Sequence, residues 1–350
     1  MKIILGVLFS VFVSQSSFSQ SYAKELQAVA TDILDSMTDL QKKRVLFDMK
    51  DSARVQWNNL PIGLRARVGV NIGAMTEGQR IQLHRLISVS LSSQGYLKST
   101  AVFHMDNLLN MMYDTLKARG EVNERTYKFL MDLKWTHKNF YLAFFGDPRS
   151  GKNWGYKIEG HHLSLNFTVL DGKVAVTPFF IGSDPAEYRI LEYAGWRILG
   201  QEDDLGIKLV NSFTPEMRKR ATWDTVVPGD IITAAESGKR LINNWGVKVG
   251  DMNAAQQDLV ARIIREYLFN FEWEKANEEY GKIMKAGLKD VYFGWIGPYT
   301  ENQSHYFMLN GPTFLIEMDN RGNHIHTIWR EKGNEYGEDL LKRHYLETKH

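Results

Sequence analysis

The residues best suited to chemistry are histidines, which gather in two stretches of the chain. Residues 154–166 read Trp-Gly-Tyr-Lys-Ile-Glu-Gly-His-His-Leu-Ser-Leu-Asn, and residues 311–330 contain a second His-bearing segment. Neutral imidazole is the commonest metal ligand in proteins and a frequent general base. The two stretches therefore predict one candidate site. Five of the ten histidines lie in or beside them: His161, His162, His305, His324 and His326.

The spacing of these histidines indicates how they are presented. On a strand, residues two apart face the same way, so His324 and His326 share one face and suit two ligands of a single metal. By the same rule His162 and Asn166 share a face. His161 points away from His162 unless a bulge forms at the preceding glycine. We therefore predict four metal ligands: His161, His162, His324 and His326.

Carboxylate, amide and guanidinium groups near the histidines are candidate catalytic residues. Glu159 and Glu317 are each placed to act as a further ligand or as a base, and His344 is a further candidate ligand. Asn166 and Arg330 complete the candidate catalytic set, with Arg330 suited to an anionic substrate. Two or three imidazoles with a carboxylate suit zinc, copper or iron. A metal-free polar pocket and a purely structural role stay open as alternatives.

Composition excludes several other classes of site. The chain has no cysteine, which rules out thiolate metal sites, cysteine nucleophiles and iron–sulfur clusters. The nucleophile-elbow pattern Gly-x-Ser-x-Gly and the zinc-protease pattern His-Glu-x-x-His are both absent. A net charge of +2 without a basic block gives nucleic-acid binding no electrostatic support. A small-molecule or extracellular substrate is the expected partner, and no oligomeric state is indicated.

The elements that must position these residues follow from periodicity. Residues 20–130 have a helical pattern, with capping boxes predicted at Thr38–Gln41 and Thr76–Gln79. A buried strand is predicted at 140–145. Asp171-Gly172 is a type I′ turn signal and predicts a hairpin over 162–180. Helices return after residue 214, and four further strands are predicted at residues 291–296, 305–309, 313–318 and 324–329.

Repeated patterns predict an internal duplication. Tyr141–Gly146 is similar to Tyr292–Gly297, and the same offset aligns Gly160 with Gly311. We expect an α+β fold of two similar halves, residues 22–200 and 205–345. Each half would be a helical segment followed by a small antiparallel sheet, with the His-bearing strands central. The length suits one large domain over residues 20–350.

The first 19 residues have the pattern of a signal peptide. Lys2 precedes an apolar run over residues 3–13, and small residues at Ser17 and Ser19 suit cleavage before Gln20. An apolar run this short cannot cross a bilayer core, which needs roughly 20 residues. We therefore expect an exported protein, periplasmic or extracellular, without stable membrane insertion.

The longer motifs resemble a known family. They are Trp154-Gly-Tyr, Glu159-Gly-His-His-Leu-Ser-Leu-Asn166, Thr177-Pro-Phe-Phe-Ile-Gly182, Phe293-Gly-Trp-Ile-Gly297, Gly311-Pro-Thr-Phe-Leu-Ile-Glu317, Asn323-His-Ile-His326 and Tyr336-Gly-Glu-Asp-Leu-Leu341. Together they resemble the exported bacterial family known as domain of unknown function number 3500, with Tyr156 where tryptophan is more usual. The resemblance covers nearly the whole mature chain and implies that the motifs belong to one domain. It implies no activity.

The sequence thus favours an exported His-based metalloenzyme, a hydrolase or an oxidoreductase, with an aromatic-lined pocket. The alternative is a metal-free periplasmic or extracellular ligand-binding protein. In either case the two His-bearing stretches are expected to meet.

Overall fold

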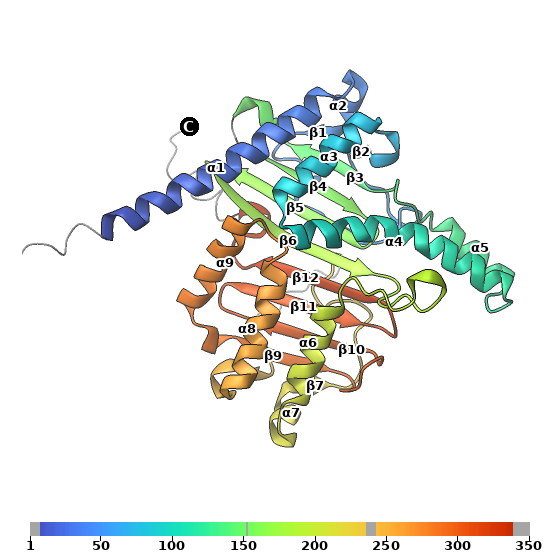
Figure 1. The fold of residues 1–350 in the computed structure, drawn as a ribbon, viewed down its shortest axis with the longest axis vertical. Coiled ribbons are helices and arrows are strands. Elements are labelled where there is room, and N and C mark those ends of the chain that lie inside the picture. The colour runs from blue at the N-terminus through green and yellow to red at the C-terminus, as the bar shows by residue number, and fades with distance from the viewer. Residues whose placement is uncertain (1–7, 152, 236–242, 339–350) are drawn as a thin grey trace, which may run out of the picture.

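The computed structural model describes residues 8–151, 153–235 and 243–338. In these residues a mixed sheet of twelve strands packs against nine α-helices (Figure 1). The helices are α1 (Leu8–Asp35), α2 (Asp39–Val45), α3 (Glu77–Ser90), α4 (Ser93–Ala118), α5 (Glu124–Asp132), α6 (Gly200–Asn211), α7 (Pro215–Ala221), α8 (Ala254–Leu268) and α9 (Trp273–Ala286). The strands are β1 (Leu46–Phe47), β2 (Val70–Asn71), β3 (Tyr141–Phe145), β4 (Trp154–Gly160), β5 (Leu163–Leu170), β6 (Lys173–Ser183), β7 (Thr222–Asp224), β8 (Val247–Lys248), β9 (Tyr292–Ile296), β10 (His305–Asn310), β11 (Phe314–Asn320) and β12 (Ile325–Glu331).

The sheet follows the order β1-β3-β4-β5-β6-β12-β11-β10-β9-β7. The short strands β2 and β8 pair with β3 and β9. Antiparallel β6 and β12 lie side by side at its centre, and β1 and β7 close its edges by pairing in parallel with β3 and β9. The two His-bearing segments, far apart in the chain, therefore meet across the central strand pair.

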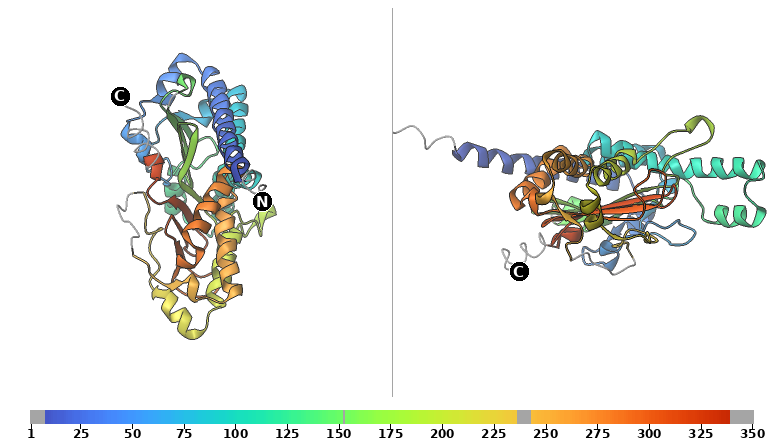
Figure 2. Two further views of the ribbon diagram at one scale, coloured as in Figure 1. Left: turned by 90° about the vertical axis from the view of Figure 1, so that its left-hand side faces the viewer. Right: turned by 90° about the horizontal axis from the view of Figure 1, so that it is seen from below.

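The two faces of the sheet are covered differently. The long helices α1, α3, α4, α6, α8 and α9 lie on one face, and loops cross the other (Figure 2). Along β5, Leu163, Leu165 and Phe167 join the main core. Ser164 and Asn166 alternate with them and are also buried, beneath the loop layer. The sheet is thus buried on both faces, which explains why its strands carry so few exposed residues.

Helix starts and turns agree with the sequence patterns. Both predicted capping boxes are confirmed, with Thr38 and Thr76 accepting from the backbone N–H of Gln41 and Gln79. The predicted hairpin of β5 and β6 is confirmed as well. Its turn residues Asp171 and Gly172 have φ values of 49° and 73°, as a type I′ turn requires. The four predicted C-terminal strands also appear as β9 to β12, with ends within two residues of those expected.

Residues 46–76 depart from the predicted helix. They form two short strands, short 3-10 turns and a long loop that crosses the face of the sheet opposite the helices. Gly69 shows the cause, because its φ is 102° and a Cβ there would lie 2.1 Å from the carbonyl oxygen of Leu142. The backbone of this segment packs directly against β3 at Gly69, and a helix could not approach the strand so closely.

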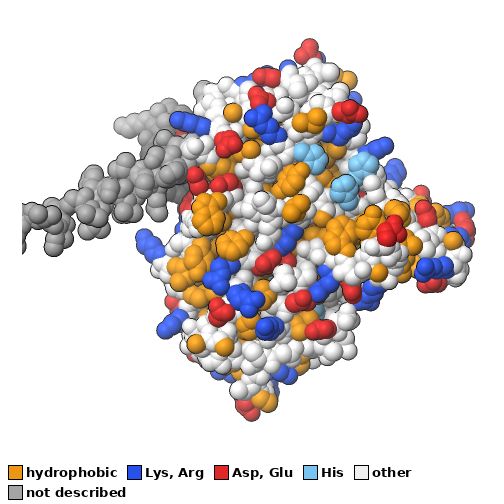
Figure 3. All heavy atoms as spheres, in the orientation of Figure 1, with side chains coloured by type: hydrophobic (Ala, Val, Ile, Leu, Met, Phe, Trp, Pro, Cys, Tyr) orange, Lys and Arg blue, Asp and Glu red, His pale blue; other side chains and the backbone are white. Residues whose placement is uncertain are grey.

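The surface of the helical layer retains apolar side chains (Figure 3), including Leu97, Phe269 and Trp273. None of the helices in the described part of the chain is both long and apolar enough to span a bilayer. The signal-peptide prediction lies partly outside the described residues, and the predicted cleavage point before Gln20 falls within α1.

Candidate metal centre

Two tight turns, one between β4 and β5 and one between β11 and β12, present the histidines. His161 and His162 form the turn between β4 and β5, and His162 has a left-handed backbone with φ of 59°. Its backbone N–H donates to Asn59, and its carbonyl accepts from Gly182 of β6. In β12, His326 is in register with Gly182. Gly182 therefore stands between the two His-bearing turns and brings them together.

Three imidazoles converge at this point. Nε2 of His324 lies 2.7 Å from Nε2 of His162 and 2.9 Å from Nε2 of His326. The ring centroid of His162 is 4.8 Å from that of His324 and 5.2 Å from that of His326. The three residues offer ligand atoms that all lie within 4.8 Å of one another. The expected meeting of the two stretches is confirmed.

Hydrogen bonding alone does not satisfy these nitrogens. Nδ1 of His326 donates to Asp230 Oδ1 at 2.8 Å, so a neutral His326 ring presents only a lone pair at Nε2. If Nε2 of His324 carries a proton and donates it to that lone pair, the same nitrogen has no lone pair with which to accept a hydrogen bond from His162. If His162 donates to His324, the pair His324–His326 has no proton between its nitrogens. One close contact therefore lacks a normal hydrogen bond, whereas a shared cation would accept all three lone pairs.

The surroundings favour the neutral form of two of these imidazoles, those of His162 and His324. Burial, followed by the proximity of His161, His324 and His326, lowers the pKa of His162 well below its usual value. Burial, followed by the proximity of His326, lowers the pKa of His324 in the same direction. A neutral ring is the form that binds a metal. His162 and His326 are buried, while His324 keeps 31% of its side chain exposed, so the cluster opens to solvent at His324.

Aspartates that sequence reasoning missed surround the imidazoles. Asp230 and Asp319 lie 2.8 and 3.8 Å from Nδ1 of His326. Asp184 lies 3.8 Å from Nδ1 of His324. Carboxylates on the outer nitrogen fix the tautomer and orientation of a ligating histidine. Only Asp319 gave a sequence signal, because it lies two residues from Glu317 and therefore on the same strand face.

His161 lies beside the imidazole trio, on the side of α4. Its Nδ1 is bonded to Asp106 of α4 at 2.7 Å, and both side chains are buried. Its ring packs on that of His162, with 3.7 Å between centroids. Asp106, His161 and His162 form a second group whose ligand atoms lie within 4.8 Å, but His161 is outside the trio that converges on His324. Burial raises the pKa of Asp106, and the nearby His161 opposes this shift.

The structure places Glu159 and Glu317 in the same cross-strand row, four strands apart. At about 4.8 Å between strands they are separated by about 19 Å, so they cannot act together on one metal. Glu159 pairs with Arg67 at 2.7 Å. Glu317 accepts from the Thr233 hydroxyl, from Tyr306 at 2.9 Å and from backbone N–H groups. Both carboxylates are thus engaged in buried networks outside the groups of potential metal ligands.

The other sequence candidates also lie outside the imidazole trio. Asn166 donates to the carbonyl of Pro178 at 2.8 Å, beneath the loop layer. Arg330 donates to the carbonyl of Thr233 at 2.6 Å and extends the network of Glu317. His305 is fully buried beside Asp203, on the helical side of β10. His344 lies outside the described residues.

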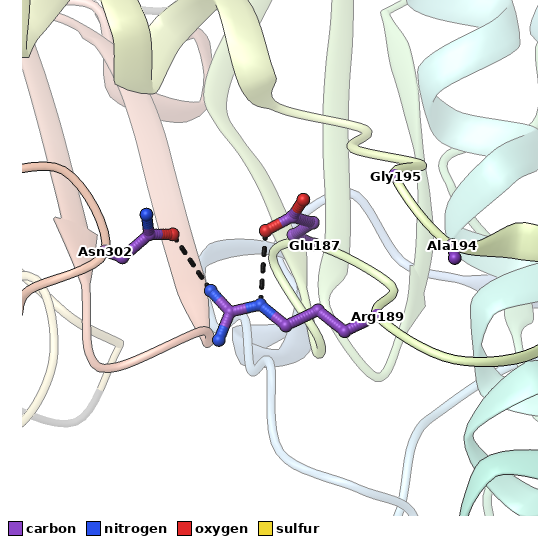
Figure 4. A pocket seen from close by; sticks show the side chains of 5 residues that line it. All are labelled: Glu187, Arg189, Ala194, Gly195 and Asn302. Atoms are coloured by element: carbon purple, nitrogen blue, oxygen red, sulfur yellow. Dashed lines mark hydrogen bonds and ion pairs between the residues drawn. The ribbon is translucent and has the colours of Figure 1, made fainter.

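A shallow pocket of about 550 Å³ adjoins the turn before His324 (Figure 4). Arg189 is held in it by Glu187 at 3.1 Å and by Asn302 at 2.9 Å. The backbone N–H and carbonyl of Glu187 are bonded to the side chain of Asn323, the residue before His324. The pocket wall is therefore tied directly to the His-bearing turn.

Comparison with known protein families matches residues 19–338 to the family described as "Protein of unknown function (DUF3500)". No curated protein and no solved structure gave a significant match. The family resemblance seen in the His-bearing motifs is thereby confirmed over nearly the whole described chain. This protein belongs to the DUF3500 family.

Proposed function

We propose that this protein binds a transition metal through His162, His324 and His326 and is a metal-dependent enzyme. The observation that supports this most strongly is the convergence of three Nε2 atoms, two pairs of which lie at 2.7 and 2.9 Å. Nitrogens bound to one tetrahedral metal at about 2.0–2.1 Å would be about 3.3 Å apart. A shift of about half an ångström per pair converts the observed cluster into such a coordination shell.

The donor set favours zinc or copper over iron. All three converging donors are imidazole nitrogens, and no carboxylate belongs to that trio. Non-haem iron typically takes two histidines and one carboxylate, whereas imidazole donors suit zinc and copper. Asp230 would serve instead to hold the ring of His326 by its hydrogen bond, while Asp319 and Asp184, at 3.8 Å from Nδ1 of His326 and His324, would contribute negative charge nearby.

Hydrolysis is the reaction class that three neutral ligands support best. A bound metal with an open position would act as a Lewis acid and lower the pKa of a bound water to about 7. The exposed edge of His324 marks the open side, where a substrate can approach. Asp184, with 24% of its side chain exposed, lies on that side, 3.8 Å from Nδ1 of His324, and is placed to accept a hydrogen bond from an approaching water.

An oxidoreductase is the second candidate. It is favoured by a specific observation, the packing of aromatic rings in series against His162. A series of aromatic rings has no role in metal-assisted hydrolysis, but it suits the transfer of single electrons to or from copper. The next subsection develops this feature.

Metal uptake by the purified chain tests the proposal. Chelator-treated protein is titrated calorimetrically with Zn²⁺ and with Cu²⁺, and one site per chain is expected. His324→Ala removes a ligand that is partly exposed and precedes β12, so the fold should survive while affinity falls by more than about 100-fold, beyond the usual loss for a supporting residue. The control His104→Ala, an exposed position on α4, should bind as the wild type does.

His344→Ala provides a second comparison, since sequence reasoning also considered His344 as a ligand; we expect it to retain most of its affinity. Uptake of neither metal by the wild-type chain would reject the centre and leave the metal-free ligand-binding alternative. Equal binding by wild type and His324→Ala would remove His324 from the site.

We also propose that the protein is exported. The support is the N-terminal pattern of Lys2, an apolar run and small residues before Gln20. N-terminal sequencing of protein recovered from outside the cytoplasm should begin at Gln20. An intact N-terminus would contradict the proposal.

The internal duplication is proposed on paired features of the two halves. Gln79 and Gln256 each complete a capping box, and each side chain donates to a serine carbonyl at 2.8 Å, that of Ser36 or Ser212. Strands β1 and β2 pair with β3 as β7 and β8 pair with β9. At the offset that aligns Tyr141 with Tyr292, residues 312 and 313 take the place of His161 and His162. Only one His cluster would therefore form, and an experimental structure whose halves superpose would support this proposal.

A further inference from the structure

Four aromatic rings are arranged in series from a metal ligand to the edge of the molecule. His162 packs on His161 with 3.7 Å between ring centroids. His161 is stacked on Trp135 at 6.1 Å with 20° between the planes. Trp135 is in turn stacked on Tyr113 at 5.4 Å and 19°. Trp135 is 5% exposed, whereas Tyr113 is only partly buried, so the series begins at the proposed metal and ends near solvent.

The rings come from separate elements that fix their order. Tyr113 belongs to α4, Trp135 to the loop after α5, and His161 and His162 to the turn between β4 and β5. Asp106, one of the buried residues of α4, holds His161 by its Nδ1 at 2.7 Å. The carbonyl of Trp135 accepts from Asn110 at 2.6 Å. The bond to Asp106 fixes the imidazole ring of His161, and the bond from Asn110 fixes the backbone of Trp135, whose ring is buried between those of His161 and Tyr113.

The chemistry of the two outer rings matters more than their size. Tryptophan and tyrosine are the aromatic side chains that lose an electron most readily, and phenylalanine does so only under far stronger oxidants. Electron transfer between rings in van der Waals or near contact is fast compared with transfer over longer gaps. A series that placed phenylalanine here would fill the same space without this property.

We propose that His161, Trp135 and Tyr113 form an electron path between the metal bound at His162 and the protein surface. The proposal rests on the metal binding described above and deepens its oxidoreductase alternative. The path would supply an electron when the reduced metal meets a peroxide. It would also lead oxidising equivalents away from the imidazole ligands.

With copper as the metal the step balances. Hydrogen peroxide accepts two electrons and two protons and becomes two molecules of water. One electron comes from Cu(I), which becomes Cu(II). The other comes from Tyr113 through Trp135 and His161. Tyr113 also releases its phenolic proton, the second proton comes from solvent, and a neutral tyrosyl radical remains. Trp135 and His161 carry the electron and end the step unchanged.

Freeze-quench electron paramagnetic resonance of the whole copper-loaded chain tests the path. Protein reduced to Cu(I) without oxygen is mixed with one equivalent of hydrogen peroxide, and copper content is measured on the same sample. We expect a tyrosyl radical in the wild type. Trp135→Phe should bind the same amount of copper but give at least tenfold less radical, because its ring does not carry the electron.

Tyr113→Phe is the second variant, and it removes only a hydroxyl from a partly buried ring. It should lose the tyrosyl signal and shift oxidation to Trp135, as detected by peptide mass spectrometry. Trp295 is the internal control, because it is buried and stacked on a histidine, His305, at 4.9 Å but has no part in the series. It should stay unoxidised in every sample.

Two outcomes would overturn the path. One is full copper content with an undiminished tyrosyl radical in Trp135→Phe. The other is oxidation spread equally over Trp135 and Trp295. Absence of copper from the wild-type chain would defeat the metal centre itself and the path with it, and the copper measurement separates that failure from the first two.

Discussion

A single methyl group at Gly182 should disrupt the metal centre. A Cβ at this position would lie 2.8 Å from Cδ2 of His162 and 2.9 Å from Cδ2 of His326. Carbon atoms in ordinary contact are about 3.5 Å apart, so Gly182→Ala would displace the two rings by about 0.6–0.7 Å. Metal–ligand distances tolerate only about 0.2 Å. Both rings are buried and have little room to recover their positions.

The size of the effect follows from these displacements. Overpacking in a buried site costs about 1–3 kcal/mol, so the metal-free variant should be less stable than the wild type by that amount. Affinity should fall at least as far as it does for loss of a supporting residue, about 10–100-fold. At saturating metal, that loss removes about 1.4–2.7 kcal/mol of the stabilisation that the metal gives.

Chemical denaturation with and without Zn²⁺, together with calorimetric titration, measures both effects. The matched control is Gly281→Ala on α9, where a Cβ would have no neighbour within 4 Å. It should leave metal binding unchanged and raise helix stability by up to about 1 kcal/mol. Unchanged zinc affinity in Gly182→Ala would show that the metal, if bound, is not held by these two rings.

Three further predictions concern residues around the centre and in the core. Asp230→Asn weakens the bond to Nδ1 of His326 and should reduce metal affinity by about 10–100-fold with the fold retained, as titration will show. Glu317→Ala leaves buried donors, including Tyr306, without their acceptor; it should cost about 1–3 kcal/mol per unpaired donor in denaturant unfolding while metal uptake is unchanged. Burial raises the pKa of Tyr156 and Tyr306 well above 10 in the folded chain. Their contribution to stability is complete below about pH 10 and is lost at higher pH, because the unfolded chain ionises first; phenolate absorbance should therefore appear together with unfolding, and its appearance in folded protein would contradict the prediction.

Local patterns predicted the elements and the histidines well. The alternation of apolar and polar residues and the Asp-Gly signal located the β5–β6 hairpin. The two-residue spacing predicted that the side chains of His324 and His326 face the same way, and their Nε2 atoms lie 2.9 Å apart. Each of these features depends on neighbours within a few residues, so the sequence contains the information. The loop over residues 46–76 was missed because its conformation depends on contact with β3.

The partners of the histidines could not be predicted in the same way. Asp106 is 55 residues from His161, and Asp230 is 96 residues from His326, so only tertiary packing joins them. Glu317 was chosen for its sequence proximity to the histidines. The register of β11 with β12 instead places Asp319 opposite His326, two residues farther along the same face. Sheet register, which one sequence does not reveal, decided which carboxylate reached the site.

X-ray absorption spectroscopy of the metal-loaded chain tests the central claim most directly. With one equivalent of Zn²⁺ or Cu²⁺ bound, we predict three imidazole nitrogens in the first shell, at about 2.0–2.1 Å for zinc. Imidazole scattering should decrease by one ring in His324→Ala. A first shell of oxygen atoms without imidazole scattering, or a spectrum unchanged by His324→Ala, would contradict the three-histidine centre.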